Sequence, residues 1–223
     1  MADWTTTIRQ VLPRLLSVSR HLRPTLHLDS VAELTPEFLR ARGIRTVIWD
    51  VDGTLMPWHA RDVEPALAPA FEALLRAEGV RHVILSNCSD ERLAELGRLF
   101  PGVPVLKGYD TPEGRRCRRL LGGVDGWTDA RDAPSPAEAR PIRKPDAALV
   151  AFALEEAGET EARRAAMVGD QYMTDIAGAN LAGVQSIKVR TVARSTFPFA
   201  VRWFQRIEEV WQRLLAGRGA PSG

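Results

Sequence analysis

The sequence predicts an α/β fold: a Rossmann-like, three-layer structure in which helices cover both faces of a parallel sheet. Two observations predict it. Short apolar runs bounded by turn residues alternate with segments of helical periodicity, which is typical of βαβ units. Polar side chains directly follow several of the apolar runs, and in open α/β sheets ligands bind outside the carboxyl ends of the strands. The sequence thus predicts both the layers and the edge at which a site would lie.

The first elements show the local signals on which this prediction depends. Thr35 is a suitable N-cap for a short helix, with Pro36 at its first position and Gly43 beyond its end. Gly79 likewise follows a helical segment. The expected strands are Arg45–Asp50, Arg81–Ser86, Val103–Leu106, Ala165–Gly169 and Val184–Val189. The expected helices are Thr5–Ser19, Thr35–Arg42, Pro65–Glu78, Asp90–Phe100, Pro145–Ala157, Tyr172–Ala182 and Phe197–Ala216.

Two segments do not fit the repeat. Lys107–Arg143 is rich in Arg, Gly, Pro and Asp and lacks periodicity, so we expect an insertion that is in part an irregular loop. Phe197–Ala216 is a strongly amphipathic helix, whose apolar side comprises Trp203, Phe204, Ile207, Trp211, Leu214 and Leu215. We therefore expect an N-terminal amphipathic helix and leader (1–30), an α/β domain with the insertion 107–143 (31–195), and a C-terminal amphipathic helix and tail (196–223).

Composition narrows the class of protein. Hydrophobic residues make up 45% and charged residues 26% of the 223 residues, as in ordinary globular proteins. A formal net charge of only +2 gives no argument for nucleic-acid binding. Cys88 and Cys117 cannot form a disulfide framework, and there is no apolar leader or run of 18 apolar residues. We expect a cytoplasmic protein, with contact to the inner membrane face left open.

The segment WDVDGTLMPW carries the strongest chemical signal. Asp50 and Asp52 stand at alternate positions at the end of an apolar strand, so they project to the same side. Gly53 then allows a sharp turn. Two acids beside a tight turn suit a metal-assisted reaction on a phosphate. The alternative is a plain strand and turn, in which Asp and Gly serve only as turn formers.

Other strands also end in polar residues. Ser86 and Asn87 follow the second strand, and Asp170 and Asp175 follow the fourth. Lys144 precedes a helix that we expect Pro145 to open. Each has a structural alternative: Ser86–Asn87 and Asp170 as helix caps, and Asp175 as a solvated surface acid. Trp58 and His59 either contact substrate or belong to a surface loop, and Cys88 is expected to serve in packing.

Taken in order, the segments DVDGT, ILSN, RKPD and GDQYMTD resemble the motifs of the haloacid dehalogenase (HAD) superfamily. LRPTLHLDSVAELTPEFLRARGIRTVIWDVDGTL and GDQYMTDIAGANLAGVQSIKV are similar to the YqeG-type phosphatases of HAD subclass IIIA, which include mitochondrial phosphatidylglycerophosphate phosphatases. The chain departs from that family at Gly53, where Asn is commoner, at Cys88, and in the length of the insertion.

The resemblance implies specific roles for these residues. A Mg²⁺ ion would bind to Asp50, Asp170 and the backbone carbonyl of Asp52, with Asp175 fixing Asp170 or a water. Asp50 would be the nucleophile that forms an aspartyl-phosphate, and Asp52 the general acid and base. The phosphate-binding residues would be Ser86, Asn87 and Lys144, while Thr54 would orient Asp52 or the local turn.

The substrate is left open by the sequence. The ten or so residues between Thr54 and the next helix leave no room for a cap domain there, and the insertion is short, so we expect a capless enzyme or one with a small lid. The leading hypothesis is a phosphatase acting on phosphatidylglycerophosphate. A soluble phosphatase for a sugar, nucleotide or polynucleotide 3′-phosphate is the alternative, and a non-catalytic scaffold is a third. Thr5–Ser19 and Phe197–Ala216 either lie on a membrane or pack on the domain or a second subunit.

Overall fold

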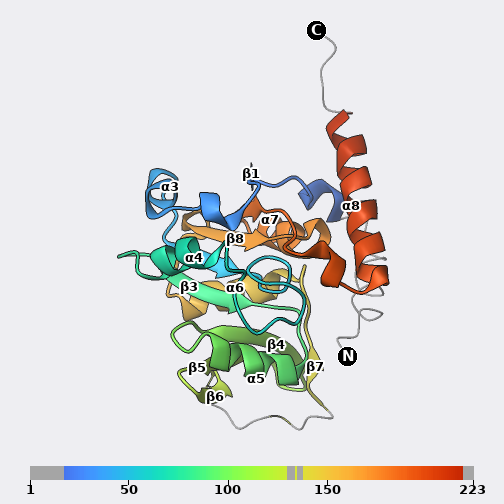
Figure 1. The fold of residues 1–223 in the computed structure, drawn as a ribbon. Coiled ribbons are helices and arrows are strands. Elements are labelled where there is room, and N and C mark those ends of the chain that lie inside the picture. Colours follow the sequence, from blue (N-terminus) through green and yellow to red (C-terminus); the bar gives the residue numbers. More distant parts are fainter. Residues whose placement is uncertain (1–17, 130–133, 135–137, 218–223) are drawn as a thin grey trace.

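The computed structural model describes residues 18–129, 134 and 138–217, with side chains of the last helix described as far as residue 210 (Figure 1). The predicted helix Thr5–Ser19 therefore lies outside the described residues except at its last two positions. The side chains of Trp211, Leu214 and Leu215 also lie outside the description.

Within the described residues, nine strands form one sheet, in the order β1-β9-β8-β2-β3-β4-β5-β6, with β7 paired to β4. The strands are β1 (Leu26–His27), β2 (Thr46–Trp49), β3 (Arg81–Leu85), β4 (Val105–Thr111), β5 (Gly114–Leu121), β6 (Val124–Trp127), β7 (Arg140–Pro141), β8 (Ala165–Gly169) and β9 (Gln185–Lys188). The pairs from β1 to β4 are parallel. The pairs that involve β5, β6 and β7 are antiparallel.

The helices fall between the strands as the sequence predicts. The α-helices are α3 (Pro36–Ala41), α4 (Ala68–Leu75), α5 (Asp90–Leu99), α6 (Ala147–Glu156), α7 (Ala177–Leu181) and α8 (Phe199–Gly217). Single turns add the 3₁₀ helices η2 (Ser19–His21), η3 (Val31–Glu33), η4 (Ala162–Arg164) and η6 (Arg194–Thr196), and the π-helix η5 (Tyr172–Ile176). The expected helix Tyr172–Ala182 is thus a π turn followed by α7. Pro145 does not open α6, because Asp146 is the N-cap and accepts a hydrogen bond from the Ala148 N–H.

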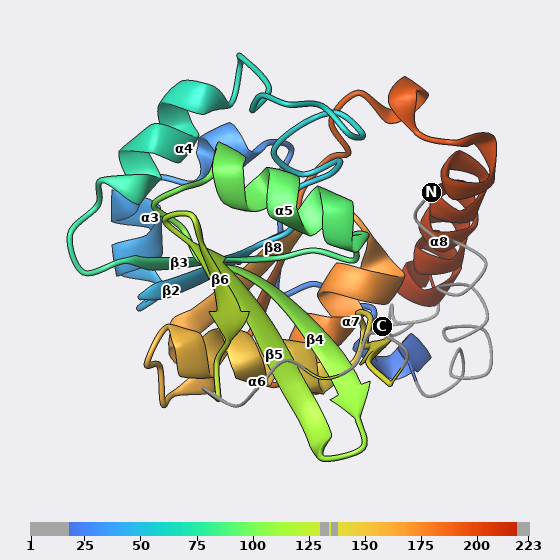
Figure 2. The same cartoon turned by 90° about the horizontal axis from the view of Figure 1, so that it is seen from below.

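The helices lie in two layers around the sheet, which confirms the predicted α/β class (Figure 2). Successive side chains of β2 point to opposite faces of the sheet, and both faces are apolar. Val47 and Trp49 belong to the core shared with α3, α4 and α5. Ile48 belongs to the core shared with α6 and α7. All four residues of β2 are buried, as expected for a central parallel strand.

The order of the strands creates a switch point between β2 and β8. From β2 the chain proceeds outward to β3 and β4, and it later returns to β8 and proceeds outward to β9 in the opposite direction. The two strands pair in register, with Trp49 opposite Val168. The residues that follow them therefore emerge side by side at the carboxyl edge, where α/β folds bind ligands.

The predicted insertion Lys107–Arg143 is less irregular than expected. β4 continues to Thr111, and β5 and β6 follow it as antiparallel strands that extend the sheet. These strands were not predicted because they lack the alternation of apolar and polar residues that indicates a strand. Ion pairs between neighbouring strands take the place of apolar contacts. Arg118, for example, forms an ion pair with Asp125 on the neighbouring strand.

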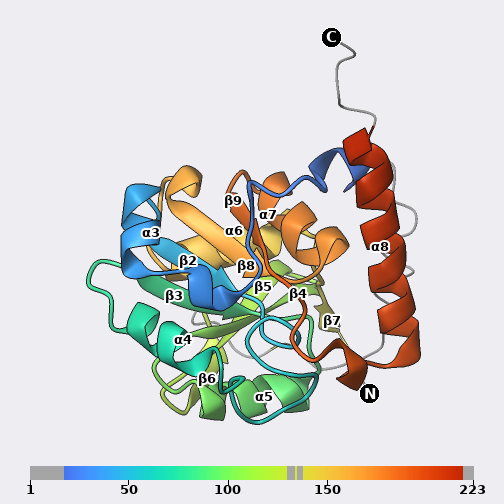
Figure 3. The same cartoon turned by 45° about the horizontal axis from the view of Figure 1, so that its top comes forward.

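Helix α8 stands at one side of the molecule (Figure 3). Phe204, from the predicted apolar side, is partly buried and packs on the cluster that contains Met173 and Ala177. The buried side chains of α8 in the described part are Val201, Gln205 and Glu208. The apolar residues Phe199 and Trp203 are 73% and 57% exposed. No helix in the described ranges is long and apolar enough to cross a membrane.

His82 links the sheet to α4 and provides a test of this packing. Its Nδ1 accepts a hydrogen bond from Trp49 Nε1 (3.1 Å), so the ring proton lies on Nε2, which donates to the Leu74 carbonyl oxygen (3.0 Å). Burial lowers the pKa of His82 to about 4. The folded chain therefore holds this ring neutral at a pH where an unfolded histidine, with a pKa near 6.5, takes up a proton.

We predict that this difference makes stability fall as the pH falls. The contribution of neutral His82 is complete above pH 6.5 and is lost progressively between pH 6.5 and pH 4, by up to about 3 kcal/mol. His82→Gln keeps a hydrogen-bonding side chain but cannot titrate. Urea unfolding at pH 7, 5.5 and 4 should show a smaller loss of stability in the variant than in the wild type. Equal losses in the two proteins would contradict the neutral, buried ring.

Candidate active site

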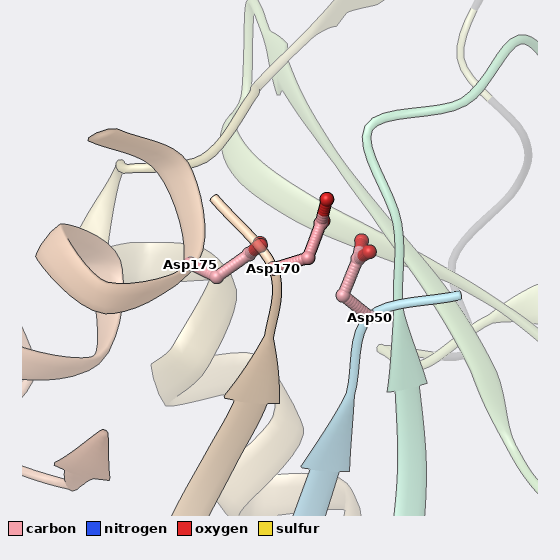
Figure 4. Close-up of side chains that lie close together, drawn as sticks. All are labelled: Asp50, Asp170 and Asp175. Atoms are coloured by element: carbon pink, nitrogen blue, oxygen red, sulfur yellow. The ribbon is translucent and has the colours of Figure 1, made fainter. Parts of the chain in front are cut away.

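Three buried carboxylates meet at the switch point (Figure 4). Asp50 follows β2, Asp170 follows β8, and Asp175 lies in the π turn η5. One ligand oxygen from each lies within 4.8 Å of the others. The sequence predicted that all three belong to the site, and the fold brings them together. Asp175 is fully enclosed, not the solvated surface acid of the alternative interpretation.

Lys144 binds two of these acids directly. Its Nζ donates to Asp50 Oδ1 and to Asp175 Oδ1, each at 2.6 Å, and its side chain is only 2% exposed. Burial acts to lower the pKa of Lys144, but the two adjacent carboxylates raise it above its ordinary value. The lysine is therefore held as a cation inside the cluster.

Asn87 fixes the backbone of Lys144. Its side-chain Oδ1 accepts a hydrogen bond from the Lys144 N–H (2.8 Å), and its Nδ2 donates to the Lys144 carbonyl oxygen (3.3 Å). The amide is thus engaged in positioning the lysine, whereas phosphate binding by Asn87 stays a prediction. Ser86, its neighbour, lines the cleft above the carboxylates.

Thr54 contacts Asp50, not Asp52 as expected. Its hydroxyl donates to Asp50 Oδ2 at 3.1 Å, while Lys144 occupies Oδ1. Both oxygens of Asp50 are therefore held by donors. Burial raises the pKa of Asp50 to about 7, against the opposing charge of Lys144.

Asp52 is anchored by a residue that the sequence did not indicate. Its Oδ1 accepts from Arg92 Nη2 (2.7 Å) and from the His59 backbone N–H (3.0 Å). Arg92 is itself held by Glu95 at 2.7 Å. Both bonds end on one oxygen of Asp52, whose side chain lines the cleft. Arg92 stands among the inner residues of α5, and no local pattern marks it.

Asp170 is the carboxylate best placed to accept a cation. Burial, with the adjacent Asp50 and Asp175, raises its pKa well above the ordinary value. Gln205 Nε2 donates to Oδ2 at 3.2 Å. In the described part of the chain, Oδ1 is buried without a hydrogen-bond partner. An unpartnered buried oxygen beside other carboxylates fits a hard divalent cation.

The formal charges support the same assignment. Asp50, Asp170 and Asp175 (−3) with Lys144 (+1) sum to −2. The buried ammonium group of Lys188 acts on Asp170 from outside this set and opposes the rise in its pKa. A divalent cation would neutralise this cluster, and it would also favour the ionised forms of Asp50 and Asp170. The residues present therefore fit Mg²⁺, whose preferred ligands are carboxylate and carbonyl oxygens.

The cleft at this edge is small and polar. Its lining comprises Asp50, Asp52, Trp58, His59, Ser86, Asn87, Cys88, Lys144, Gln171 and Thr174. Burial raises the pKa of Cys88 to about 11, which disfavours the thiolate form. No described residue of the segment 107–143 lines the cleft. A larger groove, about 510 Å³, lies at the amino ends of β3 and β4 and contains no acid cluster.

Gly53 is required where the first motif turns towards Asp170. Its φ is +96°, and a Cβ there would lie 2.7 Å from Phe197 Cζ and 2.9 Å from Asp170 Oδ2. A side chain at this position would push on the acid directly. YqeG-type sequences more often have Asn at this position. In this chain Phe197 lies too close to Gly53 for any side chain to fit there without a shift.

Comparison with known proteins agrees with this geometry. A family model described as HAD-hydrolase-like matches residues 141–196. The chain is 30% identical over 195 residues to "Phosphatidylglycerophosphate phosphatase 1, chloroplastic" of Chlamydomonas reinhardtii, covering 84% of this chain and 60% of that protein. It is 25% identical over 185 residues to "Probable phosphatase YqeG" of Bacillus subtilis (strain 168), covering 83% and 86%.

A solved structure of an uncharacterized protein from Listeria monocytogenes serotype 4b also matches, at 20% identity and a TM-score of 0.41, covering 70% of this chain and 85% of that one. The family model describes a HAD-type hydrolase, and both relatives are named as phosphatases. Within that superfamily the chain is similar to the YqeG-type phosphatases. It spans 60% of the length of the algal relative.

Gly169 lets Asp175 pack against the end of β8, because a Cβ at Gly169 would overlap the Asp175 side chain. We predict that Gly169→Ala displaces Asp175, separates it from Lys144 and lowers the free energy of unfolding by about 1–3 kcal/mol. Gly102→Ala is the matched control, since no atom lies within 4 Å of its Cβ position and its φ is not positive. Urea denaturation should separate the two variants, and equal stabilities would refute the close-approach argument.

Proposed function

We propose that the chain is a Mg²⁺-dependent phosphomonoester hydrolase that reacts through an aspartyl-phosphate on Asp50. The observation that carries this proposal is the buried cluster in which Lys144 bridges Asp50 and Asp175, together with Asp170, whose Oδ1 has no hydrogen-bond partner among the described residues. An acid at the end of a strand, held beside a lysine and close to a second buried carboxylate, suits attack on a phosphate.

The ion would be held by Asp50, Asp170 and the backbone carbonyl of Asp52. When bound, it offsets the negative charge of the phosphoryl group, which otherwise repels an anionic nucleophile. Asp175 and Thr54 contribute indirectly: Asp175 holds Lys144, and Thr54 holds Asp50. Ser86 and Lys144 face the same cleft and would bind phosphoryl oxygens.

In the first step, a carboxylate oxygen of Asp50 attacks phosphorus. The bond between phosphorus and the ester oxygen breaks, and protonated Asp52 gives its proton to the leaving alkoxide. Lys144 supplies positive charge to the phosphoryl oxygens as they pass through the transition state. The products of this step are the free alcohol and an aspartyl-phosphate on Asp50.

In the second step, the Asp52 carboxylate takes a proton from water as the water oxygen attacks phosphorus. The bond between phosphorus and Asp50 breaks, which releases phosphate and restores both acids to their starting forms. The contacts from Arg92 and His59 hold Asp52 in place for both transfers.

We predict that Asp50→Asn abolishes hydrolysis, with a fall in kcat of at least about a thousandfold, because the amide cannot form the phosphoenzyme. Phosphate release should be measured on a panel of phosphate esters, with Mg²⁺ and with EDTA. Asp62→Asn, an exposed acid outside the cluster, is the control and should retain wild-type turnover. Normal turnover by Asp50→Asn would rule out this nucleophile.

We further propose that the substrate is a lipid phosphate of the phosphatidylglycerophosphate type, met at an anionic membrane surface. Two observations support this proposal. The algal relative is named as a phosphatase of that lipid. The exposed side of α8 carries the apolar residues Phe199, Trp203, Ile207 and Val210, flanked by Arg202 and Arg206. Such a surface suits an interfacial helix on anionic lipid.

The acids on α8 do not oppose this surface. Glu208 is buried, and Glu209 forms an ion pair with Arg194 at 2.8 Å. Neither adds an uncompensated negative charge beside the exposed apolar residues. The helix thus presents apolar and basic groups together on its outer side.

We predict that the double substitution Trp203→Ser and Ile207→Ser lowers kcat/KM about tenfold or more for phosphatidylglycerophosphate in mixed micelles. Turnover of a small soluble ester should not change, because both residues lie outside the cleft. If the wild type hydrolyses soluble sugar or nucleotide phosphates well and leaves the micellar lipid untouched, the lipid proposal fails. If it hydrolyses no ester, the scaffold hypothesis is favoured.

A further inference from the structure

We infer that the C-terminal helix α8 completes the cation site, with Gln205 as a positioning residue for Asp170 and Glu208 as a support for the turn that carries Asp175. The identity of the cation rests on the proposed function. The helix itself lies beyond residues 141–196, which match the family model, so that match does not assign it a role.

Gln205 reaches Asp170 from outside the α/β repeat. Its side chain is 3% exposed, and Nε2 donates to Asp170 Oδ2 at 3.2 Å. This bond fixes one oxygen of Asp170 and leaves Oδ1 for a cation. A neutral amide suits this task, since a lysine or arginine in its place would repel the metal.

The carbonyl oxygen of the same amide is the second observation. In the described part of the chain, Gln205 Oε1 is buried and accepts no hydrogen bond, and the same holds for Asp170 Oδ1. A buried acceptor without a donor is unfavourable. A hydrated cation supplies what both lack: positive charge for the carboxylate and water O–H groups for the amide oxygen.

Glu208 holds the first turn of η5. Its Oε2 accepts from the Tyr172 N–H (3.3 Å) and its Oε1 from the Met173 N–H (3.1 Å). Backbone N–H groups at the start of a helix lack partners within that helix, and a carboxylate is a favourable acceptor there. Gln205 and Glu208 are three residues apart, so they lie on one side of α8 and reach both acidic segments together.

The orientation of α8 indicates that these contacts decide how the helix docks. Burying an amide and a carboxylate is unfavourable unless each is bonded, whereas burying Phe199 and Trp203 would be favourable. The helix nevertheless turns Gln205 and Glu208 inward and leaves those two aromatic rings exposed. Val201 and Phe204 add apolar contacts, so the helix docks through polar bonds to the acidic segments together with a small apolar contact.

The test is Mg²⁺ binding to the full chain, measured by titration calorimetry without substrate. We expect Gln205→Leu and Gln205→Met to weaken binding about 10- to 100-fold, as loss of a contact to a metal-binding carboxylate typically does. Methionine keeps an unbranched side chain of similar length, so it serves where leucine disturbs folding. Melting temperature in EDTA checks the folding of each variant.

Val201→Ala is the matched control. Val201 is buried on the same side of α8, but its apolar side chain cannot form a hydrogen bond to Asp170. The substitution should lower the melting temperature and leave the Mg²⁺ dissociation constant unchanged. If both Gln205 variants bind Mg²⁺ like the wild type, or if Val201→Ala weakens binding equally, the inference is wrong while the proposed function stands. If the wild type binds no Mg²⁺, both this inference and the proposed Mg²⁺-dependent function are contradicted.

Discussion

The ammonium group of Lys144, bonded at once to Asp50 and Asp175, is the interaction on which the site depends. Three carboxylates enclosed within a few ångströms repel one another strongly in a low-dielectric interior. The lysine offsets one charge and joins the end of β2 to the turn after β8. It leaves two formal negative charges, which is the charge that a divalent ion balances. The same contact thus offsets the repulsion among the acids and sets the charge that the proposed ion would balance.

The rest of the molecule positions this contact. Pairing of β2 with β8 places Asp50 beside Asp170, and the glycines at 53 and 169 let other groups approach the acids closely. Asn87 fixes the backbone of Lys144 from the end of β3. Helix α8 contacts the site through two buried polar side chains: Gln205 bonds to Asp170, and Glu208 bonds to the turn that carries Asp175. The outer side of α8 is left apolar, so one helix connects the acid centre with the surface at which we propose lipid is met.

Much of this could be predicted from the sequence, because strand periodicity and chain order place Asp50, Ser86, Lys144 and Asp170 at one edge. The contacts of Arg92 and Gln205 could not, since each is a single polar residue on an amphipathic helix and acts only through the tertiary fold. The hairpin of β5 and β6 escaped prediction because ion pairs take the place of apolar alternation. Amphipathicity left open where the apolar side of α8 would lie, and in the structure Trp203 and Ile207 are exposed while the polar Gln205 and Glu208 are buried.

The central claim is that one divalent cation binds between Asp50 and Asp170 at the switch point. Anomalous diffraction from crystals containing Mn²⁺ tests it most directly, because manganese accepts the same oxygen ligands and can be located independently of the protein phases. The account predicts a single strong peak in contact with a carboxylate oxygen of Asp50 and with Asp170 Oδ1, and no peak after Asp170→Asn. A peak elsewhere, or an empty cluster at saturating Mn²⁺, would contradict it.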